Sequence, residues 1–184
     1  MKQTGLKFLM ALCAGLVFTA FVTTAPAAQG HMSGTHMFDK GMQPILASYL
    51  KIQETLAADS FEGVRAAAQA IVKHAAKLDA KSVKGEHAKH YESIPAKLKE
   101  AATILSKAGD IAAAREALKA VSKPMAMWGT MSTPSGIDVV FCSMAKASWL
   151  QQQGAVRNPY YGKSMLACGE VVGGAGHKGS AMKH

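Results

Sequence analysis

The chain has few of the residues that most catalytic and cofactor sites need. Of its 184 residues only 12 are acidic, 7 are histidine and 3 are cysteine. It has no C-x-x-C, G-x-S-x-G or H-E-x-x-H sequence and no phosphate-binding glycine loop. These are the patterns of thiol redox, serine hydrolase, zinc peptidase and nucleotide sites. Because the acidic residues are also spread along helical stretches, as on a solvated surface, we expect a protein that is not an enzyme.

Acidic residues are outnumbered by basic ones, and the formal net charge is +9. Such an excess can attract nucleic acid or anionic membranes. The lysines, however, are scattered between alanines, and no basic block is interleaved with aromatic residues, which form only 7% of the chain. We expect a solvated basic surface and no nucleic-acid partner.

Long apolar runs are lacking except near the N-terminus, where LKFLMALCAGLVFTAFV occupies residues 6–22. Lys2 and Lys7 make the start basic, and Ala25 and Ala27 form an A-x-A site after the run. This order is typical of a secretory signal peptide. An uncleaved membrane anchor is disfavoured because the run is near the lower length limit for a span. We expect removal of residues 1–28, a periplasmic or other extracytoplasmic location, and no stable membrane insertion afterwards.

Removal of the signal peptide changes two counts. The net charge falls from +9 to +7 with the loss of Lys2 and Lys7, and three cysteines become two because Cys13 lies in the apolar run. An even pair in an exported protein first suggests a disulfide, here between Cys142 and Cys168. Closing a loop of this size stabilises a fold by about 3 kcal/mol in the chain-entropy model.

Residues 42–172 have the pattern of one domain between two flexible tails, a Met- and His-containing tail at 29–41 and a glycine-rich tail at 173–184. Apolar residues recur at helical spacing in four stretches with short links between them. Short links favour antiparallel neighbours, so we predict an all-α fold, an up-down four-helix bundle with an irregular C-terminal segment packed on it. Within that segment, residues 137–141 have the character of a short strand. The predicted buried positions include Ile45, Tyr49, Leu56, Ile71, Tyr91, Ile94, Leu98, Leu105, Leu118, Val121, Met125 and Trp128.

Two short motifs in the C-terminal segment each place a thiol near a thioether. They are Cys142-Ser143-Met144 and Met165-Leu166-Ala167-Cys168-Gly169. Thiols and thioethers suit a soft ion such as copper(I), with silver or another soft metal as alternatives. We therefore predict a metal site formed by Cys142, Met144, Met165 and Cys168.

The disulfide, with both methionines as ordinary core residues, stays open beside the metal site. A distance near 2 Å between the two cysteine sulfurs would indicate the disulfide. A distance of about 3.5 to 4.5 Å, with converging thioethers, would indicate the metal site, since metal–sulfur bonds measure about 2.3 Å.

The same segment resembles domain-of-unknown-function family number 3347. The resemblance is carried by F-C-S-M at 141–144, A-S-W-L at 147–150 and R-N-P-Y-Y-G-K-S-M-L-A-C-G-E-V at 157–171. The family commonly has proline where Ser143 stands here. The matching positions are Cys142, Met144, Trp149, Arg157, Asn158, Pro159, Tyr160, Tyr161, Gly162, Met165, Cys168 and Gly169.

The resembled domain occurs as a stand-alone exported protein and at the C-terminus of CusB-type adaptor subunits of heavy-metal efflux pumps. It therefore implies a helical bundle linked to copper or silver handling. We expect an exported copper(I)-binding protein that acts as a chaperone, buffer or accessory to efflux, with a pump subunit as partner. The alternative is a disulfide-stabilised interaction module of the cell envelope that binds no metal. Trp149 and the two tyrosines are expected to cover the cysteine pair, and Arg157 to pair with Glu170.

Overall fold

The computed structural model describes residues 29–174, so the expected signal peptide at 1–28 lies outside the described residues. Helix α1 (Gln29–Ala57) contains residues 29–41, which the sequence analysis assigns to a tail. Phe38 is 2% exposed, and its ring meets the Tyr91 ring edge-on with the centroids 5.0 Å apart. These contacts with distant parts of the chain explain why a segment without apolar periodicity is helical.

Three further helices follow: α2 (Val64–Ala75), α3 (Ala88–Leu105) and α4 (Ile111–Ser132). At the start of α4, the Asp110 carboxylate accepts the backbone N–H of Ala113 at 2.8 Å as an N-cap. The predicted buried faces are confirmed, with 0–4% exposure at Ile45, Tyr49, Leu56, Ile71, Tyr91, Ile94, Leu98, Leu105, Leu118, Val121, Met125 and Trp128. Within residues 29–174 no helix combines the length and apolar character needed to cross a membrane.

Three prolines lie inside these helices: Pro44 in α1, Pro95 in α3 and Pro124 in α4. A proline removes one backbone hydrogen bond and often interrupts a helix. All three helices continue past their proline, so neither Pro95 nor Pro124 splits the helix that contains it.

The segment after α4 forms a three-stranded antiparallel sheet, so the fold mixes helices with a sheet and the predicted all-α class is wrong. Its strands are β1 (Ile137–Cys142), β2 (Ala147–Gln152) and β3 (Glu170–Gly174), in the order β2-β1-β3. A strand was expected only over β1. The sequence hides the sheet because β1 is buried at five of its six positions and lacks the polar-apolar alternation of a half-exposed strand. Two glycines assigned to the tail, at 173 and 174, belong to β3.

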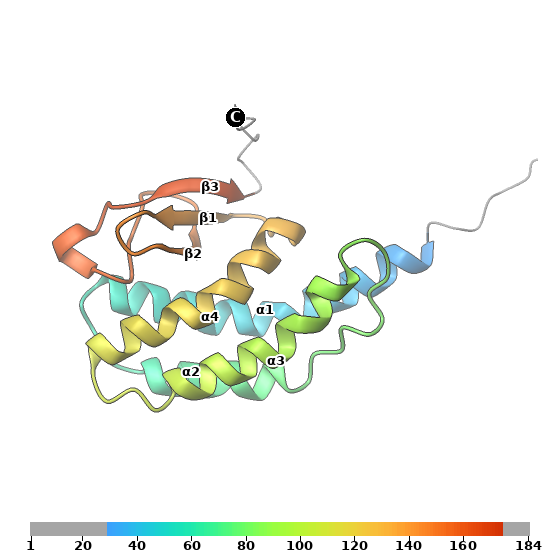
Figure 1. The fold of residues 1–184 in the computed structure, drawn as a ribbon, viewed down its shortest axis with the longest axis horizontal. Coiled ribbons are helices and arrows are strands. Elements are labelled where there is room, and N and C mark those ends of the chain that lie inside the picture. Colours follow the sequence, from blue (N-terminus) through green and yellow to red (C-terminus); the bar gives the residue numbers. More distant parts are fainter. Residues whose placement is uncertain (1–28, 175–184) are drawn as a thin grey trace, which may run out of the picture.

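The sheet lies against α4 and α1, and α2 and α3 lie on the far side of these two helices (Figure 1). Close approach of α4 to β2 requires a glycine at position 129, since a Cβ there would lie 2.6 Å from Leu150 Cδ2. The Tyr49 hydroxyl of α1 meets Ser122 Oγ of α4 at 2.6 Å and accepts the Leu150 N–H at 3.3 Å. One buried hydroxyl thus joins two helices to the sheet.

Candidate functional site

The fold brings the two cysteines into direct contact. Cys142 is the last residue of β1, and Cys168 lies two residues before β3, the strand that pairs with β1. Their Sγ atoms are 2.8 Å apart although the residues are 26 positions apart in the sequence. Both are free thiols in the structure. The pairing of β1 with β3 is therefore what assembles the predicted cysteine pair.

The 2.8 Å separation falls between the two distances that the sequence analysis set out. It is longer than a sulfur–sulfur bond of about 2.05 Å. It is shorter than the separation of about 3.5 to 4.5 Å expected for two sulfurs that share one metal ion. A displacement of roughly 1 Å would convert the observed arrangement into either of these states.

The turn between β1 and β2 surrounds the Cys142 sulfur with backbone donors. The N–H of Ala145 approaches this sulfur at 3.4 Å, and the N–H of Met144 faces both cysteine sulfurs. Burial alone would raise the pKa of the Cys142 thiol. Hydrogen bonds from Cys168, the two backbone N–H groups and the Asn158 side chain outweigh it and lower that pKa below its usual value.

The pKa of Cys168 shifts in the opposite direction to that of Cys142. Its hydrogen bond to Cys142, together with burial, raises the pKa of the Cys168 thiol. The pair therefore favours one arrangement of charge, with a thiolate at Cys142 and a proton retained at Cys168.

The two predicted methionine ligands flank the pair and contribute through their backbone. Met144 lies in the turn that follows β1, with its side chain 62% exposed, and its carbonyl accepts the Tyr161 hydroxyl at 3.1 Å. Met165 ends the 3₁₀ helix η1 (Gly162–Met165), is half-buried, and accepts the Cys168 N–H at 3.0 Å. Each methionine lies within three residues of its cysteine in the sequence.

Asn158 connects the backbone of Cys168 to the backbone of Tyr160 and Tyr161. The sequence patterns did not predict this role. Asn158 is fully buried, and its Nδ2 donates to the Cys168 carbonyl at 2.7 Å. Its Oδ1 accepts the N–H groups of Tyr160 at 2.8 Å and Tyr161 at 3.3 Å. Its own N–H donates to Leu166 O at 2.8 Å. The one available signal was asparagine before proline, which favours a turn closed by the asparagine side chain.

Two of the three aromatic residues that were expected to cover the pair, Trp149 and Tyr160, are buried and pack against each other. Trp149 is fully buried, and its ring lies edge-on to that of Tyr160 with the centroids 5.7 Å apart. The Tyr160 hydroxyl donates to Ser148 O at 2.6 Å, and burial raises the pKa of this tyrosine. Tyr161 lies at the more exposed edge of the site.

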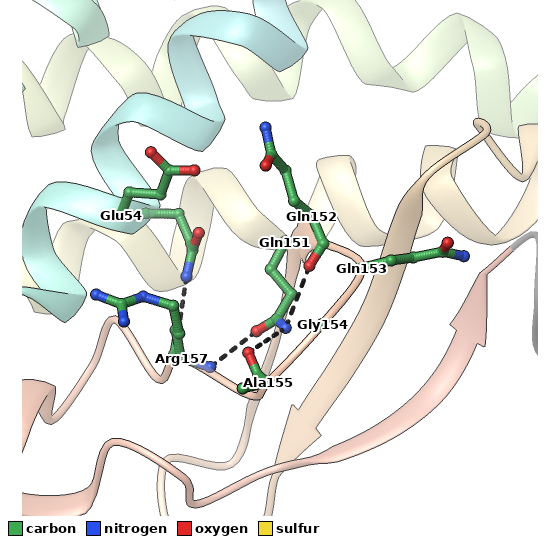
Figure 2. A pocket seen from close by; sticks show the side chains of 8 residues that line it. Glu54, Gln151, Gln152, Gln153, Gly154, Ala155 and Arg157 are labelled. Atoms are coloured by element: carbon green, nitrogen blue, oxygen red, sulfur yellow. Dashed lines mark hydrogen bonds between the residues drawn. The ribbon is translucent and has the colours of Figure 1, made fainter.

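Arg157 does not form the expected pair with Glu170. The ion pairs within residues 29–174 are Arg115–Asp59 and Lys119–Glu116. Arg157 is instead held through its backbone, whose N–H donates to Gln151 Oε1 at 3.0 Å (Figure 2). Its guanidinium borders a cavity of about 350 Å³ lined by the side chains and backbone of Gln53, Glu54, Gln151, Gln152, Gln153, Gly154 and Ala155.

Few harder metal ligands accompany the cysteine pair. In the described part of the chain, no three His, Cys, Asp or Glu side chains cluster as a metal site would require. His87 and His90 have ring centroids 6.2 Å apart, and both residues are exposed. The two thiols of the pair are therefore not part of a larger cluster of His, Cys, Asp or Glu side chains within residues 29–174.

Comparison with known proteins assigns only the helical part of the chain. Searches among curated proteins and among solved structures found no match. One family model does match, that of a family described as a protein of unknown function (DUF3347), over residues 45–135. These residues run from α1 to just beyond α4 and end before β1, so the match excludes the cysteine pair. The chain is thus similar to DUF3347 from the second half of α1 through α4.

Proposed function

We propose that this protein is an exported soft-metal-binding protein, with copper(I) as its cargo. The observation that carries the proposal is the 2.8 Å contact between the Cys142 and Cys168 sulfurs, formed by residues 26 positions apart. Copper(I) prefers thiolate and thioether ligands, and metal–thiolate bonds form once the thiol has lost its proton. Hydrogen bonds from the turn after β1 support such a thiolate at Cys142.

The donor set supports a soft ion over a hard one. No cluster of three carboxylate, imidazole or thiol side chains occurs within the described residues, so oxygen-preferring ions lack a site near the pair. Met144 and Met165 are the closest residues in sequence that can complete a sulfur coordination shell. Because the Met144 side chain is 62% exposed, its thioether is free to meet an incoming ion before the buried Cys142 does.

We further propose that the mature protein acts outside the cytoplasm as a copper chaperone, buffer or accessory to heavy-metal efflux, with a pump subunit as partner. The support is the signal-like residues 1–28 and the similarity of the helices to DUF3347. A mass spectrum of protein isolated from the extracytoplasmic fraction should show a chain that begins at Ala28 or Gln29. A chain that retains Met1 would contradict export by a cleaved signal.

Copper(I) titration of the reduced protein against a chromophoric chelator tests the metal site. The full chain with Cys13→Ser, which leaves the pair as the only thiols, should bind about one equivalent tightly. Changing both Cys142 and Cys168 to serine should abolish this binding. If the double variant binds as well as its parent, the proposal is wrong.

Methionine variants separate the thioethers from the thiols. Met144→Leu should weaken copper(I) binding by about tenfold, because one soft ligand is lost from the exposed edge of the site. Met37→Leu is the matched control, since Met37 is similarly exposed at 61% but lies on α1. Equal affinity in the two variants would exclude Met144 as a ligand. A protein isolated without free thiols and unable to bind copper(I) would favour the disulfide-stabilised interaction module.

A further inference from the structure

The two cysteines differ in their access to solvent, and this asymmetry is independent of any metal. Cys142, the last residue of β1, is only 1% exposed. Cys168 is half-buried in the loop before β3. A reagent from solution can therefore reach the Cys168 sulfur, while Cys142 is reached most directly through Cys168, which is 2.8 Å away.

The surroundings of each sulfur fit two different roles. The N–H of Ala145 lies 3.4 Å from Cys142 Sγ, and the N–H of Met144 also faces that sulfur, so a negative charge there is stabilised when a bond to it forms or breaks. The Cys168 backbone is held by Asn158 at its carbonyl and by Met165 at its N–H. The backbone on both sides is thus fixed while the side chains remain within bonding reach.

We propose that Cys142 and Cys168 form a thiol–disulfide exchange centre, in which Cys168 reacts with disulfides from solution and Cys142 resolves the product. The reaction partner is a low-molecular-mass disulfide of the glutathione class. The centre lacks the C-x-x-C spacing of familiar exchange sites, and the pairing of β1 with β3 supplies the proximity that this spacing normally provides.

The electrons and atoms balance in two displacement steps. Cys168 first passes its proton to the Cys142 sulfur that it contacts, and the Cys168 thiolate then attacks one sulfur of the external disulfide. This attack forms a mixed disulfide and expels one thiolate, which takes up the proton from Cys142. The Cys142 thiolate then attacks the Cys168 sulfur, forms the internal disulfide and expels the second thiolate. Two cysteine thiols lose two electrons, one external disulfide is reduced to two thiols, and the two cysteine protons pass to the released thiolates.

Exchange requires no metal, so this inference stands apart from the proposed copper(I) binding. The two are connected by their shared atoms. An internal disulfide leaves neither cysteine as a thiolate ligand, so oxidation of the pair would release or exclude copper(I). This consequence, unlike the exchange itself, rests on the proposed function.

Trapping of the mixed disulfide tests the assigned roles. The full chain with Cys13→Ser is incubated with oxidised glutathione and a metal chelator, quenched by alkylation and analysed by mass spectrometry. With Cys142→Ser, Cys168 should accumulate a glutathione mixed disulfide. With Cys168→Ser, adduct formation on Cys142 should be slower by at least about tenfold, because its sulfur is buried. Equal rates in the two variants would overturn the proposal.

Two further measurements make the result decisive. In denaturing urea both serine variants should react at the same rate, which shows that the fold causes the difference; a difference that persists there would overturn the assignment. The parent with both cysteines should form the internal disulfide, and reduced glutathione should restore both thiols. A disulfide that glutathione cannot open would be a structural crosslink and would also overturn the proposal. Since the chelator excludes metal, failure here leaves the copper(I) titration unaffected, and the reverse holds.

Discussion

Gly169 places the Cys168 loop close to the sheet. Its backbone passes so near the core that an added Cβ would lie 2.6 Å from Trp149 Cη2 and 2.8 Å from Val140 Cγ1. Any side chain at this position would push the loop outward and carry the Cys168 sulfur away from Cys142. The absence of a side chain at Gly169 therefore helps to hold the Cys168 sulfur beside Cys142.

Replacing this glycine should separate the pair as well as destabilise the fold. Gly169→Ala should lower the free energy of unfolding by about 1–3 kcal/mol, the usual effect of overpacking a filled core. Urea unfolding measures this loss, and the yield of internal disulfide under mild oxidation should fall in parallel. Gly109→Ala is the control, because a Cβ there has no atom within 4 Å. Unchanged stability in Gly169→Ala would contradict the packing described.

Among the elements, the 3₁₀ helix η1 is anchored to the helices by a small network of hydrogen bonds and one ion pair. Arg115 of α4 pairs with Asp59, and its guanidinium donates to Leu56 O at 2.8 Å and Pro159 O at 3.2 Å. The second Asp59 oxygen accepts the Lys163 N–H of η1 at 3.2 Å. These contacts connect the α1–α2 turn, α4 and the 3₁₀ helix that ends at Met165.

The Asp59 network predicts a pH-dependent contribution to stability. Hydrogen bonds from Arg115 and from the Lys163 N–H, aided by the nearby positive charges, lower the pKa of Asp59 in the folded state. A lowered pKa stabilises the fold above the unfolded value of about 3.9, and this contribution is lost as the pH falls through the folded-state pKa. Asp59→Asn should therefore unfold at lower urea concentration than the wild type at neutral pH, and the difference should vanish in acid.

Asp59→Asn keeps the backbone conformation of the turn, and Glu62→Gln serves as a control for the loss of one negative charge. Asp59 has a φ of 59°, a conformation that asparagine also tolerates, so the variant tests the carboxylate rather than the turn. Glu62→Gln removes the same charge at an exposed position in the same turn, and its urea midpoint should equal that of the wild type at each pH from about 7 to 2. If Asp59→Asn also leaves the midpoint unchanged, the network does not stabilise the fold.

At the scale of the whole molecule, the helices matched by DUF3347 share a core with the sheet that the match excludes. α4 packs on β2, where Leu150 is fully buried against Gly129 and its N–H donates to the Tyr49 hydroxyl. Trp128 of α4 and Trp149 of β2 are likewise fully buried. Helices and sheet are therefore expected to unfold as one cooperative unit.

Truncating Leu150 should destabilise the helices and the sheet together. Leu150→Ala should cost about 2–5 kcal/mol, because it leaves a cavity between α4 and β2. The unfolding midpoint measured by circular dichroism, which follows helix content, and the midpoint measured by tryptophan fluorescence should both move to lower urea and coincide. Val172→Ala, at a side chain that is 49% exposed, is the control and should change little. A shift in fluorescence without a shift in helix content would show that the bundle folds without the sheet.

Local periodicity in the sequence was enough to predict four helices, but not the part of the first helix over residues 29–41. The spacing of Tyr91, Ile94, Leu98 and Leu105 predicts a buried helical face, and Asp110 marks the start of the next helix. The residue types of the two motifs were also sufficient to single out Cys142 and Cys168. These features are readable because each depends on neighbours a few positions away.

Only the tertiary structure decided how residues 137–174 are arranged. Val140 pairs with Trp149 on one side and Val171 on the other, and such pairing leaves little trace in a short, buried strand. The roles of Asn158 and of the helical residues 29–41 arise the same way, from partners far along the chain. The sequence by itself therefore singled out the two cysteines as candidate site residues, because thiols beside thioethers are recognisable from residue type alone. Long-range packing decided that their sulfurs meet at 2.8 Å, because that contact depends on the pairing of β1 with β3.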